Sequence, residues 1–486
     1  MKLSKLVSYL DTVSIRGSLE KHIRSIAYDS RKIQDNDLFV ALKGYKVDGH
    51  RFIDNAIHNG AVCVVVELAD NLPQNSNVCF IQVQDAKKAL ARLASAFYRI
   101  PSSSLNIVGV TGTNGKTTTT HILSSIFEKA GHTTGLLGTI YNKIGSQILP
   151  AVQTTPASLE LQGFLRQMVD AGVDYAVLEV SSHALALNRM DGCTLAAAGF
   201  TNFTRDHLDF HMTMDEYFAA KKAIFQYVAP YGVVALNHDD QAVNELAKGL
   251  RLKTITCGLQ DSADVRASHI ENTRQGLKFQ INTPESSFTV TSSLTGLHNV
   301  RNILMASGLA LGLGIRQEAV VDGVEAVRRV PGRFEKIDLG NDRLGIVDYA
   351  HTDDALNRLL SAARAITRSK IITIFGCGGD RDKGKRPLMG RAASELSDSV
   401  IITSDNPRTE EPMSIIRDIL TGIQTDNYRV IPDRHEAIFE AVRMALPGDT
   451  VVIAGKGHED YQETGTRRIH FSDSEVLLKS IETAEK

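Results

Sequence analysis

The feature that most constrains this fold is the Gly-rich run T-G-T-N-G-K-T-T at residues 111–118. It follows the apolar run of residues 105–110, which is typical of a buried strand, and it precedes a helical pattern from residue 116 to about residue 130. Glycines let backbone N–H groups turn toward an anion, and a helix N-terminus adds partial positive charge. A strand, a Gly-rich loop and a helix in this order predict an α/β domain with a phosphate-binding loop.

Three side chains near this loop indicate nucleotide chemistry. Lys116 can reach the β- and γ-phosphates, and the Thr117 hydroxyl can bind Mg²⁺. Glu179 ends another apolar run, and a carboxylate at the carboxyl end of a strand in the same sheet suits a direct or water-mediated Mg²⁺ ligand. The alternatives are an ordinary strand-to-helix turn and a solvated strand end, and Val110 stands where the generic loop has its first glycine. The G-K-T-T run nevertheless favours phosphate binding.

The 486 residues suggest about three domains. We predict an α/β fold with domains at residues 1–103, 104–331 and 332–486. In the first domain short strand-like runs alternate with helical patterns, and a Pro-Ser hinge at residues 101–104 ends it. The other two alternate apolar strands with helices, which predicts mostly parallel sheets, the last one doubly wound and Rossmann-like. Residues 254–291 instead have the pattern of short antiparallel strands, a side sheet.

Composition excludes several classes of protein. Hydrophobic residues make up 43% and charged residues 23% of the chain, which excludes wholesale disorder. The formal net charge of -2 argues against a general binder of nucleic acid or anionic membranes. The five cysteines are odd in number and form no C-x-x-C, so a reducing compartment is expected. The N-terminus lacks the apolar core of a signal peptide and no apolar run approaches ~20 residues, which predicts a soluble, cytoplasmic protein.

Several motifs along the chain are recognisable together. They are G-T-N-G-K-T-T at residues 112–118, E-V-S-S-H at 179–183, T-N-F-T-R-D-H-L-D at 201–209, G-L-H-N-V-R-N at 296–302, P-G-R-F-E at 331–335 and D-Y-A-H at 348–351. Over nearly its whole length, and in the same three-domain order, the chain resembles the Mur ligases, ATP-dependent enzymes that add amino acids to peptidoglycan precursors. The resemblance implies a UDP-sugar-binding first domain, a central P-loop ATPase domain and an amino-acid-binding third domain. It also implies roles in cell wall biogenesis, cell shape, cell division and the cell cycle.

The resemblance implies a reaction. ATP phosphorylates the γ-carboxylate of a D-glutamyl residue, the incoming amine attacks the acyl phosphate, and a tetrahedral intermediate collapses to an amide and phosphate. Because phosphoryl transfer to a carboxylate brings two anions together, neutralisation by metal and lysine is the main catalytic tool. The catalytic residues implied are Lys116, Glu179, His207 and Lys221. The Mg²⁺ ligands implied are Thr117, Glu179, His207 and Lys221, the last as a carbamate formed from CO₂.

Two of these assignments depend on the resemblance alone. By itself Lys221 is interpreted as a surface lysine on a helix, and Lys222 follows it. His207 lies four residues before His211, a spacing that could indicate a zinc pair. The chain has no H-E-x-x-H, so a capping role for His211 is the better interpretation.

For the nucleotide, the resemblance implies contacts from the loop and from later segments. The residues are Gly112, Thr113, Asn114, Gly115, Lys116, Thr117, Thr118, Asn299, Asn302, Arg333 and Asp348. Helix N-capping is an equally good interpretation of Asn299. In the family D-Y-A-H is usually followed by x-Pro-Asp, whereas this chain has Thr352, Asp353 and Asp354. The turn therefore lacks its proline, and its geometry is open.

For a UDP-linked muramoyl peptide, the resemblance implies ten residues in two groups. Those of the first domain are Tyr28, Ser30, Tyr45, Lys46 and Val47, and those of the second are Thr154, Thr155, Ser181, Leu187 and Arg189. Some relatives have glutamine in place of Leu187, so one polar contact is missing here. Without the resemblance, turn chemistry explains Ser30 and Thr154.

The motif D-N-P-R at residues 405–408 indicates which amino acid is added. In the family it marks the enzyme that adds meso-diaminopimelate to UDP-N-acetylmuramoyl-L-alanyl-D-glutamate. Diaminopimelate has a carboxylate and an ammonium at its far end, whereas lysine has only the ammonium, and a guanidinium binds a carboxylate through two hydrogen bonds. A surface arginine at a helix start is the alternative for Arg408. The residues implied for diaminopimelate are Arg381, Asp405, Asn406, Pro407, Arg408, Gly455 and Glu459.

Other functions remain open from the sequence. One is a sister ligase that adds L-lysine, or glutamyl units as a folylpolyglutamate synthase does. Another is a dehydrogenase, suggested by G-C-G-G at residues 376–379, although Arg381 occupies the last glycine position of G-x-G-x-x-G. A third is a catalytically silent phosphate-loop module, which the catalytic residues named above disfavour. The expected partners are small-molecule substrates, with no nucleic acid and no membrane, and the expected state is a monomer.

Overall fold

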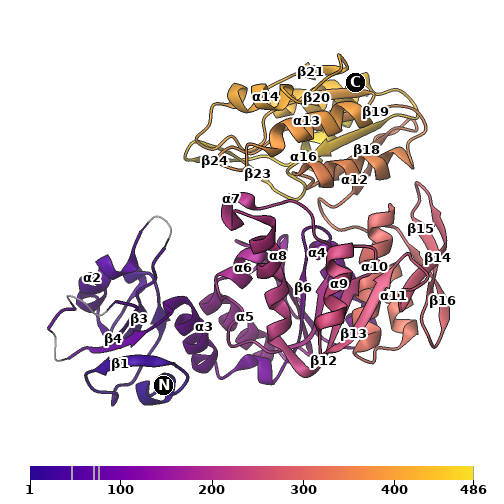
Figure 1. Ribbon diagram of the computed structural model, residues 1–486. Helices are drawn as coiled ribbons and strands as arrows, with labels where there is room; N and C mark the ends of the chain where they lie inside the picture. Colours follow the sequence, from indigo (N-terminus) through magenta and orange to yellow (C-terminus); the bar gives the residue numbers. More distant parts are fainter. Residues whose placement is uncertain (45–46, 69–71, 75–76, 485–486) are drawn as a thin grey trace. The chain divides into compact units, whose positions relative to one another are not determined.

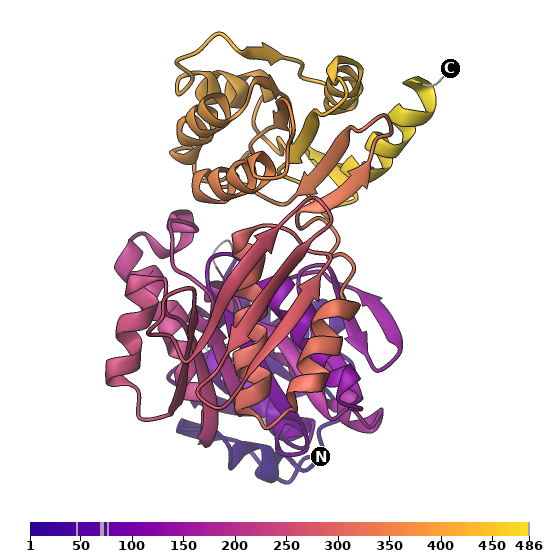
Figure 2. The ribbon, with the colours of Figure 1, turned by 90° about the vertical axis from the view of Figure 1, so that its right-hand side faces the viewer.

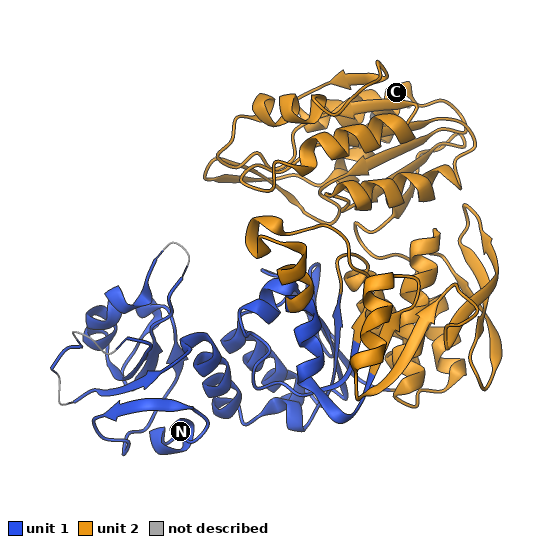
Figure 3. Ribbon diagram, in the orientation of Figure 1, with its two compact units in different colours: residues 1–111, 132–198, 220–233 blue, residues 112–131, 199–219, 234–486 orange. Residues whose placement is uncertain are grey.

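The computed structural model describes residues 1–44, 47–68, 72–74 and 77–484. The chain forms two compact units, shown in different colours in Figure 3. The first unit comprises residues 1–111, 132–198 and 220–233, and the second comprises residues 112–131, 199–219 and 234–486. Among the described helices, none combines the length and the apolar character needed to cross a membrane.

The first unit begins with a mainly parallel sheet. Its elements are α1 (Leu3–Val7), β1 (Thr12–Arg16), β2 (Ile26–Ala27), β3 (Asp37–Val40), α2 (Ile53–His58), β4 (Ala61–Val66), β5 (Cys79–Val83) and α3 (Ala86–Phe97). The strand order is β1-β5-β4-β3-β2, with β1 antiparallel to β5 and the others parallel. Alternate side chains enter two cores: Leu38 packs in the core that contains Leu90 of α3, and Phe39 in the core that contains Ala56 of α2. This is the alternation expected of strands covered on both faces.

The rest of the first unit contains parallel and antiparallel strands and two helices. Its elements are β6 (Asn106–Thr111), β7 (Thr134–Leu137), β8 (Tyr141–Ile144), β9 (Gln147–Pro150), α5 (Ser158–Asp170), β10 (Tyr175–Glu179), α6 (Ser182–Ala186) and β11 (Leu195–Phe200). Strand β10 is parallel to β6 and β7, whereas β7, β8 and β9 form antiparallel pairs. Every residue of β10 is buried. Its last residue is Glu179, so the predicted strand end is confirmed.

The second unit contains the phosphate loop and strands β13 to β16, which are part of an 11-stranded sheet, so the prediction of a side sheet was wrong. Its elements up to residue 326 are α4 (Lys116–Lys129), α7 (Leu208–His211), α9 (Gln241–Glu245), β13 (Lys253–Gly258), β14 (Val265–Asn272), β15 (Leu277–Asn282), β16 (Ser287–Ser292), α10 (Leu297–Gly312) and α11 (Gln317–Ala326). Helix α8 (Met214–Lys222) and strand β12 (Val228–Asn237) each include residues of both units. Helices α4, α10 and α11 contact one another. Strands β14, β15 and β16 are antiparallel and lie side by side in Figure 2, as predicted. The prediction was wrong for β13, which pairs in parallel with β14.

The C-terminal part of the second unit is a doubly wound sheet, as predicted (Figure 1). Its elements are β17 (Glu335–Asp338), β18 (Leu344–Asp348), α12 (Asp353–Arg364), β19 (Ile371–Phe375), α13 (Lys385–Leu396), β20 (Ser399–Ile402), α14 (Pro412–Leu420), β21 (Tyr428–Val430), α15 (Arg434–Met444), β22 (Thr450–Ala454), β23 (Tyr461–Thr464), β24 (Arg467–His470) and α16 (Asp473–Ala484). The order is β17-β18-β22-β19-β20-β21, with only β17 antiparallel. Helices α12, α13 and α14 share one core, and α15 and α16 share the other. Ligands of such sheets bind at the carboxyl ends of the strands, where the D-Y-A-H, D-N-P-R and G-K-G-H-E motifs lie.

A buried ion pair joins α15 and α16 beneath this edge. The guanidinium of Arg434 and the carboxylate of Asp473 are fully buried and form two hydrogen bonds of 2.7 Å. Arg434 also donates to the carbonyl of Ala454 at the end of β22, at 3.0 Å. Replacing Asp473 by Ala leaves a buried charge unpaired, so we expect a loss of roughly 3–5 kcal/mol in the free energy of unfolding.

Urea unfolding measures this effect. A matched control is Arg429→Met, which removes the exposed partner of Glu440 and should cost less than about 1 kcal/mol. Equal urea midpoints for the two variants would contradict the prediction.

Candidate active site

The phosphate loop lies at the start of α4, as predicted. Gly115 is the N-cap and has φ of 85°, a left-handed conformation that costs other residues about 1–2 kcal/mol. A Cβ at this position would lie 2.3 Å from Oδ1 of Asn302, so any other residue at position 115 would displace the Asn302 side chain of α10. Lys116 Nζ donates to the carbonyl oxygens of Gly112, at 2.9 Å, and Thr113, at 2.8 Å. The ammonium group is therefore held at the loop itself.

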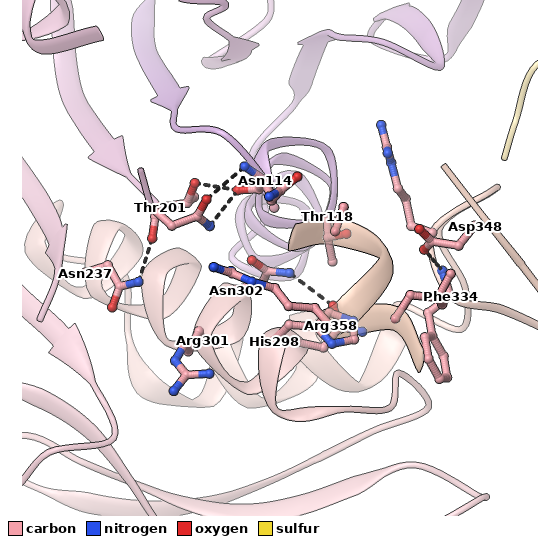
Figure 4. A pocket seen from close by; sticks show the side chains of 16 residues that line it. Asn114, Thr118, Thr201, Asn237, His298, Arg301, Asn302, Phe334, Asp348 and Arg358 are labelled. Carbon is pink, nitrogen blue, oxygen red and sulfur yellow. Dashed lines mark hydrogen bonds between the residues drawn. The ribbon is translucent and has the colours of Figure 1, made fainter. Parts of the chain in front are cut away.

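Residues 201–204 fix the loop from the side. Thr201 Oγ1 donates to the carbonyl of Asn114 at 2.6 Å, and Asn202 Oδ1 accepts from the N–H of Asn114 at 2.9 Å (Figure 4). Thr113 Oγ1 donates to the carbonyl of Thr204 at 3.1 Å. The T-N-F-T segment was noticed in the sequence, but this supporting role was not predicted.

A pocket opens beside the loop and collects most of the predicted nucleotide residues (Figure 4). Its predicted members are Asn114, Gly115, Thr118, Asn299, Asn302, Arg333 and Asp348. Members that were not predicted are Thr201, Asn202, Asn237, His298, Arg301, Phe334, Ala355, Arg358 and Leu359. Seven of the eleven predicted nucleotide residues thus line one pocket, whereas Gly112, Thr113, Lys116 and Thr117 are not among its lining residues.

Asn299 lies inside α10 and does not cap it. The N-cap of α10 is Gly296, without a side-chain hydrogen bond. Asn299 Nδ2 donates to the carbonyl of Thr295 at 2.8 Å, and its Oδ1 accepts from Asn302 Nδ2 at 3.1 Å. The capping interpretation was therefore wrong, and both asparagines present amide groups to the pocket.

Arg333 and Asp348 reach the pocket from the C-terminal part. Arg333 Nη2 donates to Oγ1 of Thr117 at 3.1 Å, and its guanidinium lies over the ring of Tyr349, 4.6 Å from the centroid. Asp348 accepts from the backbone N–H groups of Phe334, at 2.7 Å, and Ala350, at 2.8 Å. Burial raises the pKa of Asp348. Both side chains are held by their surroundings, which suits binding of a ligand in one fixed orientation.

His298 is a pocket residue that the sequence analysis missed. Burial, together with the nearby Arg358 and Arg301, lowers its pKa to about 4. The imidazole is therefore neutral near pH 7, so it can accept as well as donate a hydrogen bond. The signal was present in G-L-H-N-V-R-N, where only the asparagines were assigned.

The turn without proline has ordinary helix-start geometry. Thr352 is the N-cap of α12, and its Oγ1 accepts from the N–H of Ala355 at 3.2 Å. Asp353 occupies the first helical position, where proline is common but not required. Asp354 Oδ2 accepts from Asn114 Nδ2 at 3.2 Å and from Thr204 Oγ1 at 3.0 Å. Asp354, which was not predicted, therefore connects α12 to the phosphate loop.

His207 has φ of 53° and lies next to the Asp206 carboxylate, whose side chain is 13% exposed. Its Nε2 is 3.4 Å from Oδ2 of Asp206. Burial raises the pKa of Asp206, but His207, His351 and Lys385 together lower it to about 2. His211 is buried, and its ring packs against Tyr217 with centroids 5.1 Å apart. Within the described part of the chain, no group of three or more His, Cys, Asp or Glu side chains is placed to hold a metal.

Glu179, in the first unit, has its carboxylate fixed by one threonine. Thr139 donates its N–H to Oε1 at 2.8 Å and its hydroxyl to Oε2 at 3.0 Å. The same hydroxyl lies 3.2 Å from Oγ1 of Thr154. The carboxylate is 1% exposed, so the interpretation as a solvated strand end was wrong.

The predicted muramoyl-peptide residues of the first unit lie around the end of β10. Thr155 Oγ1 donates to the carbonyl of Glu179 at 2.8 Å and accepts from the N–H of Ser181 at 3.0 Å. Arg189 donates to the carbonyl of Thr155 at 2.8 Å, and burial lowers its pKa. Ser181 is also the N-cap of α6, and Leu187 is the C-cap. Glu179, Thr154, Thr155, Ser181 and Arg189 are therefore close together.

The first-domain residues are only partly described. Tyr45 and Lys46 lie outside the described residues, and Val47 is exposed. Tyr28 donates its hydroxyl to Glu160 at 2.9 Å, and burial raises its pKa. Ser30 is buried and begins a short 3-10 helix, but its N-cap is Asp29. The local turn therefore does not depend on the Ser30 side chain.

Lys221 is buried, not exposed. Its relative exposure is 1%, whereas the adjacent Lys222 is exposed. The interpretation as a surface lysine was wrong. An ammonium group in such a place needs a compensating charge or a chemical change.

Arg408 lies in a strained loop, not at a helix start, because α14 begins four residues later at Pro412. Its φ is 51°. Its Nη1 donates to the carbonyl of Gly379 at 2.6 Å, and its Nε lies 3.4 Å from Oε2 of Glu463. The interpretation as a surface arginine at a helix start was therefore wrong.

Asn406 and Glu459 meet beside this loop. Asn406 Nδ2 donates to Glu459 Oε2 at 2.8 Å, and Lys456 Nζ donates to Asn406 Oδ1 at 2.9 Å. Burial and the nearby Asp405 raise the pKa of Glu459. Gly455 adjoins Asp405, since a Cβ there would lie 2.9 Å from its Oδ2. The predicted Arg381 is exposed on the neighbouring loop, and Pro407 packs its carbonyl against that loop.

Three family models match the chain in sequence order. They are the Mur ligase family catalytic domain at residues 22–98, the Mur ligase middle domain at residues 110–310 and the Mur ligase glutamate ligase domain at residues 332–457. A relative from Bacillus licheniformis is 44% identical over 489 residues, covering 99% of each chain. The chain belongs to the Mur ligase family. The family and the ligase class predicted from the sequence are confirmed.

Two relatives and one solved structure carry the same name. The Bacillus licheniformis relative is a UDP-N-acetylmuramoyl-L-alanyl-D-glutamate–2,6-diaminopimelate ligase. So is a relative from Clostridium tetani, 43% identical over 486 residues with 99% of each chain covered. A solved structure of a ligase with this name is 33% identical, with a TM-score of 0.70 and 99% of each chain covered.

More distant structures share the fold of this Mur ligase. A MurF ligase from Thermotoga maritima in complex with ADP is 19% identical, with a TM-score of 0.66, covering 95% of this chain and 97% of that chain. The predicted α/β fold is confirmed. The predicted domain boundaries stay predictions.

Proposed function

We propose that this Mur ligase joins meso-diaminopimelate to UDP-N-acetylmuramoyl-L-alanyl-D-glutamate, with conversion of ATP to ADP and phosphate, in peptidoglycan precursor synthesis. Relatives with this name are 43–44% identical over essentially the whole chain. The observation that carries the proposal is the D-N-P-R loop, in which the Arg408 guanidinium is held by the carbonyl of Gly379 and Asn406 donates to Glu459. A guanidinium beside an acidic group suits the carboxylate and ammonium at the far end of diaminopimelate.

Activation of the acid is the first step. A γ-carboxylate oxygen attacks the γ-phosphorus of ATP, the bond to the bridging oxygen breaks, and ADP leaves. Lys116 and the N-terminus of α4 supply positive charge where negative charge must be stabilised. The amine of the amino acid then attacks the acyl phosphate, an amide forms, and phosphate and a proton leave.

The pocket beside the loop suits the nucleoside of ATP. Asp348 is an acceptor fixed by two backbone N–H groups, which suits a ribose hydroxyl. The neutral His298 and the amide groups of Asn299 and Asn302 suit the polar edge of a base. Asp354 would hold the C-terminal part against Asn114 while the nucleotide is bound.

Mg²⁺ prefers oxygen ligands, and the side chains proposed to hold it fit this preference. In the second unit the Thr117 hydroxyl accepts a bond from the cationic Arg333. In the first unit Thr139 orients the Glu179 carboxylate. His207 is the third residue proposed to hold a metal. A bound Mg²⁺ would neutralise phosphate charge during phosphoryl transfer.

The buried Lys221 is proposed to be a carbamate formed with CO₂, which would replace the buried ammonium by an anion that can orient Mg²⁺. In protein supplied with ¹³C-labelled CO₂, we expect a carbamate carbon signal in the NMR spectrum. The signal should be present in Lys222→Ala and absent from Lys221→Ala. A spectrum of the wild type without the signal, or loss of the signal in Lys222→Ala, would contradict the assignment.

Phosphate release with a panel of amino acids tests the function. The nucleotide dipeptide and ATP are supplied with meso-diaminopimelate, L-lysine or L-glutamate, and the product is identified by mass. We expect phosphate and amide product with diaminopimelate at the highest kcat/KM. Faster reaction with lysine or glutamate would identify a sister ligase, and absence of ATP cleavage with every amino acid would refute the proposal. The cytoplasmic location and the monomeric state stay predictions.

A further inference from the structure

A fully buried arginine lies behind the loop that carries Arg408. Arg386, on α13, has a side-chain exposure of 0%. Its guanidinium donates to both carboxylate oxygens of Glu410, at 2.7 and 3.0 Å, and to Oδ2 of Asp418 at 2.8 Å. Paired, charge-assisted hydrogen bonds of this kind are strong and restrict orientation. Arg386 is itself shielded from any ligand, so it can act only through its neighbours.

Glu410 connects Arg386 to two loops. It follows D-N-P-R in the chain, and its Oε1 also accepts from the backbone N–H of Asp380 at 2.6 Å, while Lys383 lies 3.3 Å from its Oε2. The hydrogen bonds from Arg386 lower the pKa of Glu410 to about 2, so it is ionised at neutral pH. One carboxylate thus ties the loop of residues 376–384 to the loop of residues 404–411.

The two loops are closely fitted to each other. Thr409 donates its hydroxyl to Asp380 Oδ1 at 2.7 Å, and the N–H of Gly379 donates to the carbonyl of Asn406 at 2.9 Å. A Cβ at Gly379 would lie 1.9 Å from the carbonyl oxygen of Pro407. The Arg408 side chain joins the same contact, because its Nη1 donates to the carbonyl of Gly379 at 2.6 Å. Displacement of one loop would therefore move the Arg408 guanidinium.

Both loops also contain a strained residue at this contact. Asp380 has φ of 54° and Arg408 has φ of 51°. Left-handed backbone costs a non-glycine residue about 1–2 kcal/mol, and it persists only where surrounding contacts fix it. The contacts made by Glu410 and Arg386 are of that kind, so their loss would let Arg408 relax to a different backbone conformation.

We propose that Glu410 and Arg386 are positioning residues that fix the Arg408 guanidinium for the distal carboxylate of the amino-acid substrate, and so contribute to the choice of diaminopimelate over lysine. The inference rests on the function proposed above. Arg386 is fully buried, and the Glu410 carboxylate is used by Arg386, Asp380 and Lys383, so both act through other residues. Their effect should appear in the binding of an amino acid with a distal carboxylate, and not in nucleotide binding or in the reaction of lysine, which has no group for Arg408 to hold.

The test is Glu410→Gln in the full-length enzyme. The amide has the same size as the carboxylate, but its NH₂ group faces a donor of Arg386 and cannot accept a hydrogen bond. The charge-assisted pairing between Arg386 and residue 410 is therefore lost. We expect the KM for meso-diaminopimelate to rise ~10-fold. The KM for ATP should stay within about twofold and kcat within about threefold, whereas the ratio of kcat/KM for diaminopimelate to that for lysine should fall ~10-fold. The control is Glu395→Gln on α13, the helix that carries Arg386. It removes the charged partner of the exposed Arg391, and it should leave kcat and both KM values unchanged.

A second variant keeps the proposal falsifiable if Glu410→Gln does not fold. Arg386→Lys keeps the positive charge but cannot make the paired bonds, and its KM for diaminopimelate should lie between those of the wild type and Arg386→Met. The proposal would be overturned if the KM for diaminopimelate and the KM for ATP rose by the same factor while kcat fell. It would also be overturned if the KM for diaminopimelate did not change. Failure of the proposed function is distinguishable, since the wild type itself would then give no amide with diaminopimelate.

Discussion

Lys116→Ala should lower the rate of ATP-dependent amide formation by about a thousandfold or more, because it removes the charge proposed to stabilise the transferred phosphoryl group. The ammonium of Lys116 is held between the carbonyl oxygens of Gly112 and Thr113, at 2.9 and 2.8 Å. Its position is therefore set by the loop before any ligand arrives. The measurement is phosphate release at saturating ATP, nucleotide dipeptide and diaminopimelate.

The matched control is Lys129→Ala. Lys129 is an exposed lysine at the other end of α4, so its removal alters helix charge but not the loop. We expect less than a twofold change, a size typical of an isolated surface charge. A rate for Lys116→Ala within tenfold of the wild type would show that another cation neutralises the phosphoryl group.

Much of the fold was predictable because it follows from local patterns. The apolar run before the phosphate loop is β6, the helix after it is α4, and the antiparallel pattern near residue 280 corresponds to β14, β15 and β16. Strand and helix periodicity depend on neighbouring residues only, so they can be recognised in a sequence. The parallel pairing of β13 with β14 was missed because short apolar runs do not encode strand direction.

The contacts that complete the site join distant parts of the chain. Asp354 lies 240 positions from Asn114, and no spacing rule connects them. The absent proline before Asp354 drew attention to the turn, but Thr352 caps α12 by itself. The role of Asp354 emerges only when α12 packs near the phosphate loop.

Lys221 shows the limit of residue-type reasoning. Lysine is almost never fully buried, and the Y-F-A-A-K-K run gives no reason to separate one lysine from the next. In the structure one is buried and the other is exposed. Only the resemblance to a family distinguished Lys221 from Lys222, because burial in the folded protein cannot be read from so short a segment of sequence.

Arg408→Ala should raise the KM for meso-diaminopimelate by about a hundredfold while the KM for ATP changes less than about threefold, because the two charged hydrogen bonds proposed to hold the distal carboxylate would be lost. Of the five guanidinium N–H donors, one at Nη1 is used to hold the side chain against Gly379, so the group is oriented before substrate binds. Reaction with lysine, measured in parallel, should be almost unaffected.

Arg408→Lys separates charge from geometry. An ammonium keeps the positive charge but cannot form the planar pair with a carboxylate, so the KM for diaminopimelate should lie between those of the wild type and Arg408→Ala. Arg417→Ala, at an exposed arginine of α14, serves as control. Equal increases in the KM for diaminopimelate and the KM for ATP in Arg408→Ala would mean that the loop supports the whole site. A larger effect on the reaction of lysine than on that of diaminopimelate would mean that Arg408 contacts a group that both amino acids have, and not the distal carboxylate.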